Sequence, residues 1–265
     1  MTLLQAILLG IIQGLTEFIP VSSTAHLLIG QQLLGIPAND ATFAFLVIVQ
    51  LGTLVSLFAF YWKDLLSIAK ATLDFRHATP ERNLGIYIIV ATIPALIAGY
   101  LLRDAVEALF AHPMLQGSIR LFSAAILLAL AEWLTKKNRT LDSMKWLDAL
   151  VIGLFQIIAV FPGASRSGTT IAGGMFRGFD RPSAARFAFL MSIPVMLAAG
   201  VYQMAQVIPL PNSGEILPLL AVGFVTAAIV GWFAIKWLID YLSHRSLYVF
   251  AVYCAIVGAV VLAMS

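Results

Sequence analysis

The sequence predicts an all-α polytopic membrane protein made of two inverted-topology repeats, each a re-entrant helical hairpin followed by three transmembrane helices. The first observation is composition. Of 265 residues, 61% are hydrophobic and only 11% are charged, whereas a soluble domain has about 25% charged residues. The second is that two apolar segments are interrupted by polar residues. The third is that these segments repeat in the two halves of the chain.

The first repeat, residues 1–135, opens with an interrupted apolar segment at residues 3–34. Its first part, Leu3–Phe18, would measure about 24 Å as a helix, short of a hydrocarbon core of roughly 30 Å. Pro20 and a run of hydroxyl residues then break the helix. Such a broken segment is typical of a re-entrant hairpin, whose loop must be buried in protein or line a cavity. We expect three spans to follow, at about residues 43–62, 84–102 and 116–135, joined by polar loops at 63–83 and 103–115.

The second repeat, residues 146–265, follows a polar connector at 136–145. It opens with another interrupted segment, at 146–178, and we expect spans at about 185–206, 216–239 and 247–264. A shift of 143 residues aligns the two halves and pairs Gly10 with Gly153, Gln13 with Gln156, Phe18 with Phe161, Ser22 with Ser165 and Gly30 with Gly173. Three crossings per half would invert the second half. Inverted repeats with broken helices place their site where the breaks meet.

The placement of Lys and Arg predicts the orientation. Of the sixteen, thirteen fall on the side that holds loops 63–83, 136–145, 177–186 and 240–246, and the other side receives only Arg103 and Arg120. Cytoplasmic loops are rich in these residues. We therefore expect the rich side to be cytoplasmic, with both termini and the site opening on the external face. The remaining cation, Arg166, and the acid Glu17 are the charges that we expect at membrane depth.

The first polar interruption, Gln13–His26, carries candidate metal ligands. Gln13 and Glu17 are four residues apart and share one helix face, so they can offer an amide oxygen and a carboxylate to Mg²⁺ or Ca²⁺. The alternative is that Glu17 only neutralises Arg166. Ionisable residues inside a membrane are functional by default, which favours a role in chemistry.

Hydroxyl residues and glycines at the starts of the second half-helices predict an anion site. Free backbone N–H groups and the positive dipole end of a helix bind phosphate, and the planar fork of Arg166 fits phosphate oxygens. The alternative for any single hydroxyl is ordinary N-capping. We expect the substrate-binding residues to be Ser22, Thr24, Ser165, Ser167, Gly168 and Thr170.

His26 and Ser23 are the remaining candidates for catalysis. A lone histidine is often a satisfied core residue, but beside Glu17 and a phosphate cradle an acid–base role is favoured. The nucleophile would be either Ser23 or a metal-activated water, and the residues alone leave both open. We expect the catalytic residues to be Glu17, His26, Ser23 and Arg166.

Two other features limit the class of protein. The single Cys254 offers neither a disulfide framework nor a thiolate metal site. The surplus of Lys and Arg indicates membrane topology and contact with lipid headgroups, not binding of nucleic acid.

The two polar stretches resemble the signature motifs of the bacterial undecaprenyl-diphosphate phosphatase family, which is linked to bacitracin resistance. One motif has Glu or Gln, three residues and then Glu, here Gln13-Gly-Leu-Thr-Glu17. The other is Pro-Gly-X-Ser-Arg-Ser-Gly with a following Thr, here Pro162–Gly168 and Thr170. The resemblance covers essentially the full length. The histidine mechanism of another lipid phosphatase superfamily is not supported, because no histidine follows Ser165-Arg166.

The resemblance implies that the protein hydrolyses undecaprenyl diphosphate to undecaprenyl phosphate and inorganic phosphate in the bacterial inner membrane, recycling the lipid carrier for cell-wall glycans. The implied partners are the polyprenyl diphosphate and membrane lipids, with a homodimer as an assembly to be tested. The alternative function is a secondary transporter or flippase of a lipid phosphate, because inverted repeats with broken helices are also the general plan of transporters.

Overall fold

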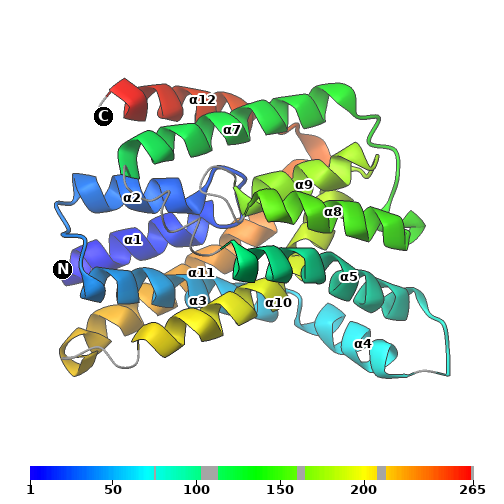
Figure 1. Ribbon diagram of the computed structural model, residues 1–265, viewed down its shortest axis with the longest axis horizontal. Helices are drawn as coiled ribbons and strands as arrows, with labels where there is room; N and C mark the ends of the chain where they lie inside the picture. Colours follow the sequence, from blue (N-terminus) through cyan, green and yellow to red (C-terminus); the bar gives the residue numbers. More distant parts are fainter. Residues whose placement is uncertain (75, 103–112, 160–164, 208–212, 264–265) are drawn as a thin grey trace.

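The computed structural model describes residues 1–74, 76–102, 113–159, 165–207 and 213–263, and Figure 1 shows these residues as a bundle of helices. The helices are α1 (Leu3–Thr16), α2 (Ser23–Leu33), α3 (Asp40–Phe60), α4 (Trp62–Leu73), α5 (Pro80–Leu101), α7 (Pro113–Leu134), α8 (Trp146–Ile158), α9 (Arg166–Phe176), α10 (Arg181–Val207), α11 (Ser213–His244) and α12 (Tyr248–Ala263).

The predicted class, an all-α polytopic membrane protein, is confirmed. Within the described ranges, five helices are long and apolar enough to cross a membrane, namely α3, α5, α7, α10 and α11. Helix α12 is apolar but shorter, with 16 residues. All six lie where a span was expected. The inverted symmetry of the two halves stays a prediction.

Helix α4 lies where the sequence suggested only a polar loop. Its apolar residues Leu65 and Ile68 are three positions apart and share one helix face. Ile68 is buried, and Thr72, one turn further along, lies against Gly85 of α5. Polar residues alternate with the apolar ones along the rest of the segment, and this mixed composition concealed a short amphipathic helix that packs on α5.

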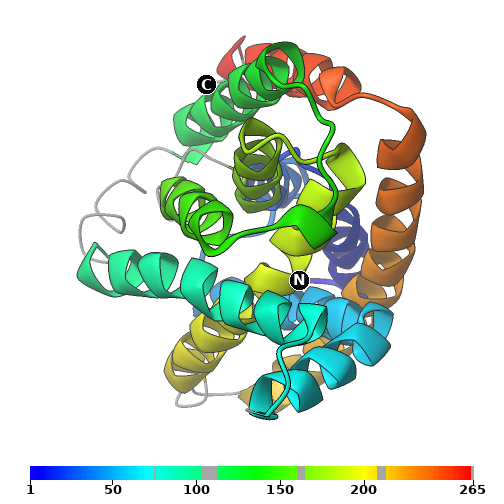
Figure 2. The same ribbon diagram turned by 90° about the vertical axis from the view of Figure 1, so that its right-hand side faces the viewer.

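The two interrupted segments form two helical hairpins. In Figure 1, α1 and α2 run side by side in one half of the molecule, and α8 and α9 run side by side in the other. The end-on view of Figure 2 shows α8 and α9 between α5 and α7. The hairpins extend from opposite ends of the bundle (Figure 1), and the start of α9 contacts the turn of the first hairpin.

Glycines let the first helix of each hairpin approach a long helix closely. A Cβ on Gly10 of α1 would lie 2.9 Å from the Gly223 carbonyl oxygen of α11, and one on Gly153 of α8 would lie 2.5 Å from the Ala91 carbonyl oxygen of α5. Membrane helices pack through such small residues, because lipid gives them no hydrophobic driving force to associate. These contacts fix how deeply each hairpin is seated.

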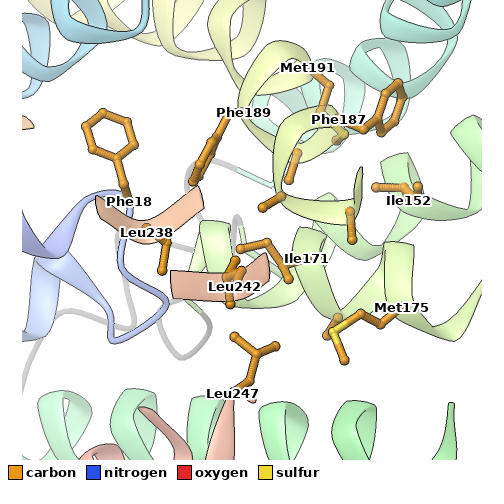
Figure 3. Close-up of a cluster of buried hydrophobic side chains, with 14 of the residues drawn as sticks. Phe18, Ile152, Ile171, Met175, Phe187, Phe189, Met191, Leu238, Leu242 and Leu247 are labelled. Carbon is orange, nitrogen blue, oxygen red and sulfur yellow. The ribbon is translucent and has the colours of Figure 1, made fainter. Parts of the chain in front are cut away.

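A buried apolar cluster connects the two hairpins (Figure 3). Phe18, next to Glu17 in the first hairpin, packs edge-to-face on Phe189 of α10 with ring centroids 5.6 Å apart. Ile171 and Met175 of α9 are fully buried in the same cluster. The cluster therefore holds Glu17 and the start of α9 at a set separation.

Buried ion pairs fix the outer end of the second hairpin. Asp148 of α8 is 1% exposed and accepts hydrogen bonds from Arg139 Nη2 at 2.8 Å and from Arg177 Nε at 2.7 Å. Arg139 also donates to the Arg177 carbonyl oxygen at 2.7 Å. A similar cluster surrounds Glu132 of α7, which pairs with Arg181. The sequence interpretation counted these cations only as signals of topology and did not find the buried acids.

We predict that Asp148→Ala destabilises the protein by about 3–5 kcal/mol, because it leaves Arg139 and Arg177 without their buried counter-charge. The midpoint of thermal unfolding in detergent should fall by at least roughly 6 °C. The matched control is Asp142→Ala, which removes an exposed acid from the connector that precedes α8. It should leave the unfolding midpoint nearly unchanged. Equal shifts in the two variants would contradict the role given to Asp148.

Candidate active site

The turn of the first hairpin holds its residues in a strained conformation. Helix α1 ends at Thr16, and Glu17 still has helical backbone angles. Ser22, just before α2, has a φ of 68° and is buried. A non-glycine residue in this left-handed region costs of order 1–3 kcal/mol, and such strain clusters at functional sites. The strain turns the chain back so that Ser23, the first residue of α2, reaches Glu17.

Glu17 is the centre of the site. Its Oε2 accepts hydrogen bonds from Ser23 Oγ at 2.7 Å and from Gln13 Nε2 at 2.9 Å, and its Oε1 accepts one from Arg166 Nη2 at 3.0 Å. Gln13 Nε2 also lies 3.4 Å from the Thr53 hydroxyl of α3. One carboxylate therefore contacts residues from both hairpins. Of the predicted site residues, these contacts bring together Gln13, Glu17, Ser23 and Arg166.

The second hairpin presents Arg166 at the first position of α9. Ser165 caps this helix, with its Oγ accepting a hydrogen bond from the Gly168 N–H at 3.2 Å. The Thr170 hydroxyl donates to the Arg166 carbonyl oxygen within the same helix at 2.7 Å. Ser167 Oγ lies 3.1 Å from Ser165 Oγ and 3.4 Å from the Ile19 carbonyl oxygen of the first hairpin. Ser165 and Thr170 thus have structural partners, and the remainder of the predicted motif, residues 161–164, lies outside the described residues.

His26 faces α12, not the carboxylate. Its Nδ1 lies 2.9 Å from the Ser22 carbonyl oxygen, which can only accept, so Nδ1 carries the proton. In the neutral ring, Nε2 then accepts from the Tyr253 hydroxyl at 2.8 Å. Among the hydrogen bonds between described residues, none joins His26 to Glu17 or Arg166. Sequence reasoning missed Tyr253, because its only signal was a hydroxyl in an apolar span 227 residues away.

Arg166 extends from the buried carboxylate toward open space. Its side chain is 28% exposed, whereas that of Glu17 is 5% exposed. Arg166 lines a small gap beside Glu17 and Ser167, and it also lines a cavity of about 520 Å³ between α5, α8 and α10. The guanidinium can therefore meet an anion while it neutralises Glu17.

The residues around Glu17 fit a magnesium ion better than a calcium ion. Gln13 Oε1 is buried and has no hydrogen-bond partner among the described residues, so an amide oxygen stands free beside the carboxylate. In the part of the chain that the structure describes, no three His, Cys, Asp or Glu residues gather at a metal site. Mg²⁺ commonly takes one or two carboxylates together with water and substrate phosphates, whereas Ca²⁺ takes six to eight oxygens.

Comparison with known proteins identifies the family. Residues 6–260 match the family described as the bacitracin resistance protein BacA. The chain belongs to the BacA family. Three relatives of this BacA-family chain bear the name undecaprenyl-diphosphatase, from Chloroherpeton thalassium, Anaeromyxobacter sp. and Methanosphaera stadtmanae. They are 42%, 41% and 38% identical to it, and the alignments cover 100%, 100% and 99% of this chain and 97%, 92% and 98% of the relatives.

We predict that Glu17 and Arg166 of this BacA-family site are coupled energetically by about 1.5 kcal/mol or more, because removing either one leaves the other charge buried. A double-mutant cycle of Glu17→Ala and Arg166→Ala, read by reversible unfolding in mixed micelles, measures the coupling. The control cycle uses Asp64 and Arg186, a pair with side chains 37% and 46% exposed, which should couple by about 0–1 kcal/mol. Similar values for the two pairs would contradict the prediction.

Proposed function

We propose that this protein is a membrane phosphatase that hydrolyses undecaprenyl diphosphate to undecaprenyl phosphate and inorganic phosphate, and thereby recycles the lipid carrier of cell-wall synthesis. Full-length relatives that carry the name undecaprenyl-diphosphatase support the proposal. The single observation that carries it is the contact of Glu17 with both Ser23 and Arg166. This contact places a hydroxyl, a proton acceptor and a phosphate-binding cation within one site.

The geometry favours Ser23 as the nucleophile. Ser23 Oγ already donates its hydrogen bond to Glu17 Oε2 at 2.7 Å, which is the arrangement of a hydroxyl beside its general base. As Ser23 Oγ bonds to the terminal phosphorus, its proton passes to Glu17 and the bond from that phosphorus to the bridging oxygen breaks. Undecaprenyl phosphate leaves. Water then attacks the phosphorus of the phosphoserine, and the bond from that phosphorus to Ser23 Oγ breaks. Glu17 returns its proton to Ser23 Oγ and accepts one from the attacking water, and inorganic phosphate is released.

Arg166 stabilises the charge that develops on the phosphoryl oxygens. Electrostatic stabilisation of this kind is often the largest contribution to catalysis. Ser22, Thr24, Ser167 and Gly168 are proposed to position the diphosphate, and His26 to exchange a proton by way of Tyr253. If Mg²⁺ takes part, Glu17 and Gln13 Oε1 would hold it, and the ion would supply charge neutralisation or a more acidic water. In that case water is the alternative nucleophile.

We propose that the protein lies in the bacterial inner membrane with its site open to the external face. The connector between α7 and α8, which carries four of the sixteen Lys and Arg residues, lies at the same end of the bundle as the connector between α4 and α5 (Figure 1). Positive charge of this kind marks the cytoplasmic side. The chain ends and the base of the α1–α2 hairpin lie at the opposite end. A homodimer and specific lipid contacts stay predictions from the sequence.

We predict that the purified protein releases phosphate from undecaprenyl diphosphate in detergent micelles, and that Glu17→Ala and Arg166→Ala each lower the rate by at least about 1,000-fold. The control variant Arg186→Ala, which loses a half-exposed ion pair far from the site, should keep its rate. Repeating the assay with a chelator, and then with Mg²⁺ added back, tests whether phosphate release requires the cation.

The same assay separates hydrolysis from transport. A flippase or transporter needs two compartments, whereas hydrolysis does not. Release of no phosphate by the wild-type protein in micelles would therefore contradict the proposed function, and wild-type rates in both variants would contradict the proposed site.

We predict that Ser23→Ala abolishes turnover and that rapid quenching of the wild-type reaction traps a phosphoryl group on Ser23. Thr16→Ala is the matched control, because the Thr16 hydroxyl bonds to the Ile12 carbonyl oxygen of its own helix at 2.6 Å. Substantial activity in Ser23→Ala would instead assign the attack to water.

A further inference from the structure

The cavity of about 520 Å³ on the far side of Arg166 has mostly apolar walls. Helix α5 contributes Ala95, Leu96, Gly99 and Tyr100, and α10 contributes Val195, Ala198, Ala199 and Tyr202. The polar groups of its lining are Arg166, the amide side chains of Gln50, Gln156 and Gln203, and the hydroxyls of Tyr100 and Tyr202. A phosphate headgroup beside Arg166 and the glutamines, with a hydrocarbon chain along the apolar walls, would fit this lining.

Gln156 of α8 is a buried amide without a partner. Its side chain is 2% exposed, and neither its Nε2 nor its Oε1 has a hydrogen-bond partner among the described residues. A buried polar group left unpaired destabilises the folded protein, because it has lost its hydrogen bonds to water. Such groups in native structures call for an explanation, and a ligand that supplies the missing hydrogen bonds is one.

The alignment of the two halves accounts for the missing partner of Gln156 among the described residues. It matches Gln13, whose Nε2 donates to Glu17 one helical turn later. The residue 143 positions after Glu17 is Val160, so the second half offers no carboxylate in the matching position. The amide is thus available to an acceptor that is not part of the protein.

We propose that Gln156 and this cavity form the subsite for the isoprenyl monophosphate part of the substrate, the part that leaves as product. This inference rests on the proposed function. Arg166 lines both the gap beside Glu17 and the cavity, so its guanidinium can contact both phosphates of one diphosphate. The terminal phosphate meets Ser23 and Glu17, and the lipid-linked phosphate accepts a hydrogen bond from Gln156 Nε2.

A neutral amide suits this position better than a second cation. After cleavage, the isoprenyl phosphate must leave while Arg166 still holds charge at the site. A hydrogen bond from an amide to a charged group is stronger than one between neutral groups, but it lacks the long-range attraction of a full charge. The isoprenoid chain lies along the α5 and α10 walls. At Gly99 an added Cβ would meet no atom within 4 Å, so this wall has room for a chain.

The experiment measures binding of two probes, farnesyl phosphate and inorganic phosphate, by calorimetry on the full-length protein in detergent. In Gln156→Leu we expect the Kd of farnesyl phosphate to rise about tenfold or more, while the Kd of inorganic phosphate stays at its wild-type value. The unfolding midpoint should not fall, because the variant removes an unpaired buried amide. Gln156→Met, closer in shape, is the second variant if Gln156→Leu fails to fold.

Two further variants sharpen the test. Gly99→Leu places a larger side chain in the apolar part of the cavity. It should weaken the binding of farnesyl phosphate and leave the binding of inorganic phosphate unchanged. Gln31→Ala removes a buried glutamine of α2 that lies outside the cavity, and it should change neither affinity. Wild-type affinity for farnesyl phosphate in Gln156→Leu and Gln156→Met, or equal loss of both probes, overturns the inference. The proposed function fails separately, if the wild-type protein releases no phosphate from undecaprenyl diphosphate.

Discussion

A carboxylate and a guanidinium that are buried among membrane helices must neutralise each other, because the surrounding hydrocarbon offers them no water. Glu17 and Arg166 meet this constraint across the two hairpins, at 3.0 Å. The pair joins segments that are 149 residues apart in the chain. Each hairpin alone would leave an unpaired charge at the middle of the bundle. The charge balance therefore makes the two hairpins one unit and places a partly exposed cation beside the Glu17 carboxylate and the Ser23 hydroxyl.

The rest of the fold keeps that contact at a fixed distance. Gly10 and Gly153 let α1 pack closely on α11 and α8 pack closely on α5. Phe18, the residue next to Glu17, is packed in the apolar cluster against Phe189. At the outer end, Asp148 clamps the connector and the end of α9 through Arg139 and Arg177. Because α9 is only 11 residues long, this clamp also sets where Arg166 at its other end can lie.

Much of this arrangement could be predicted from the sequence, because membranes restrict the choices so strongly. Apolar runs of about 20 residues mark spans, and a polar break in a run can only be buried or line a cavity. That Gln13 and Glu17 lie on one face of α1 follows from their four-residue spacing and helix geometry. The two long motifs predicted the family and the hydrolysis of a lipid diphosphate. The family is confirmed by a match over residues 6–260.

What the sequence could not provide is contact between distant helices. Nothing local in the sequence pairs Tyr253 with His26, or marks Asp148 as the buried partner of two arginines that look like topological signals. Helix α4 was missed because polar residues are mixed with its apolar ones and its periodicity spans only about three turns. The N-cap formed by Ser165 and the bond of the Thr170 hydroxyl to the Arg166 carbonyl oxygen likewise depend on the orientation of these side chains, which motif spacing does not specify. Gln156 stood in the alignment only as the counterpart of Gln13, and its lack of a partner is visible only in the packed structure.

We propose that Arg166 binds phosphate, and that Glu17, the partner of Arg166 in the free protein, competes with this phosphate for the guanidinium. Binding of inorganic phosphate to detergent-purified protein in the presence of chelator tests this claim most directly. We expect Arg166→Ala to lose phosphate binding, whereas Glu17→Ala should bind phosphate at least as tightly as the wild-type protein although its turnover is lost. Equal loss of phosphate binding in both variants, or unchanged binding in Arg166→Ala, would contradict the claim.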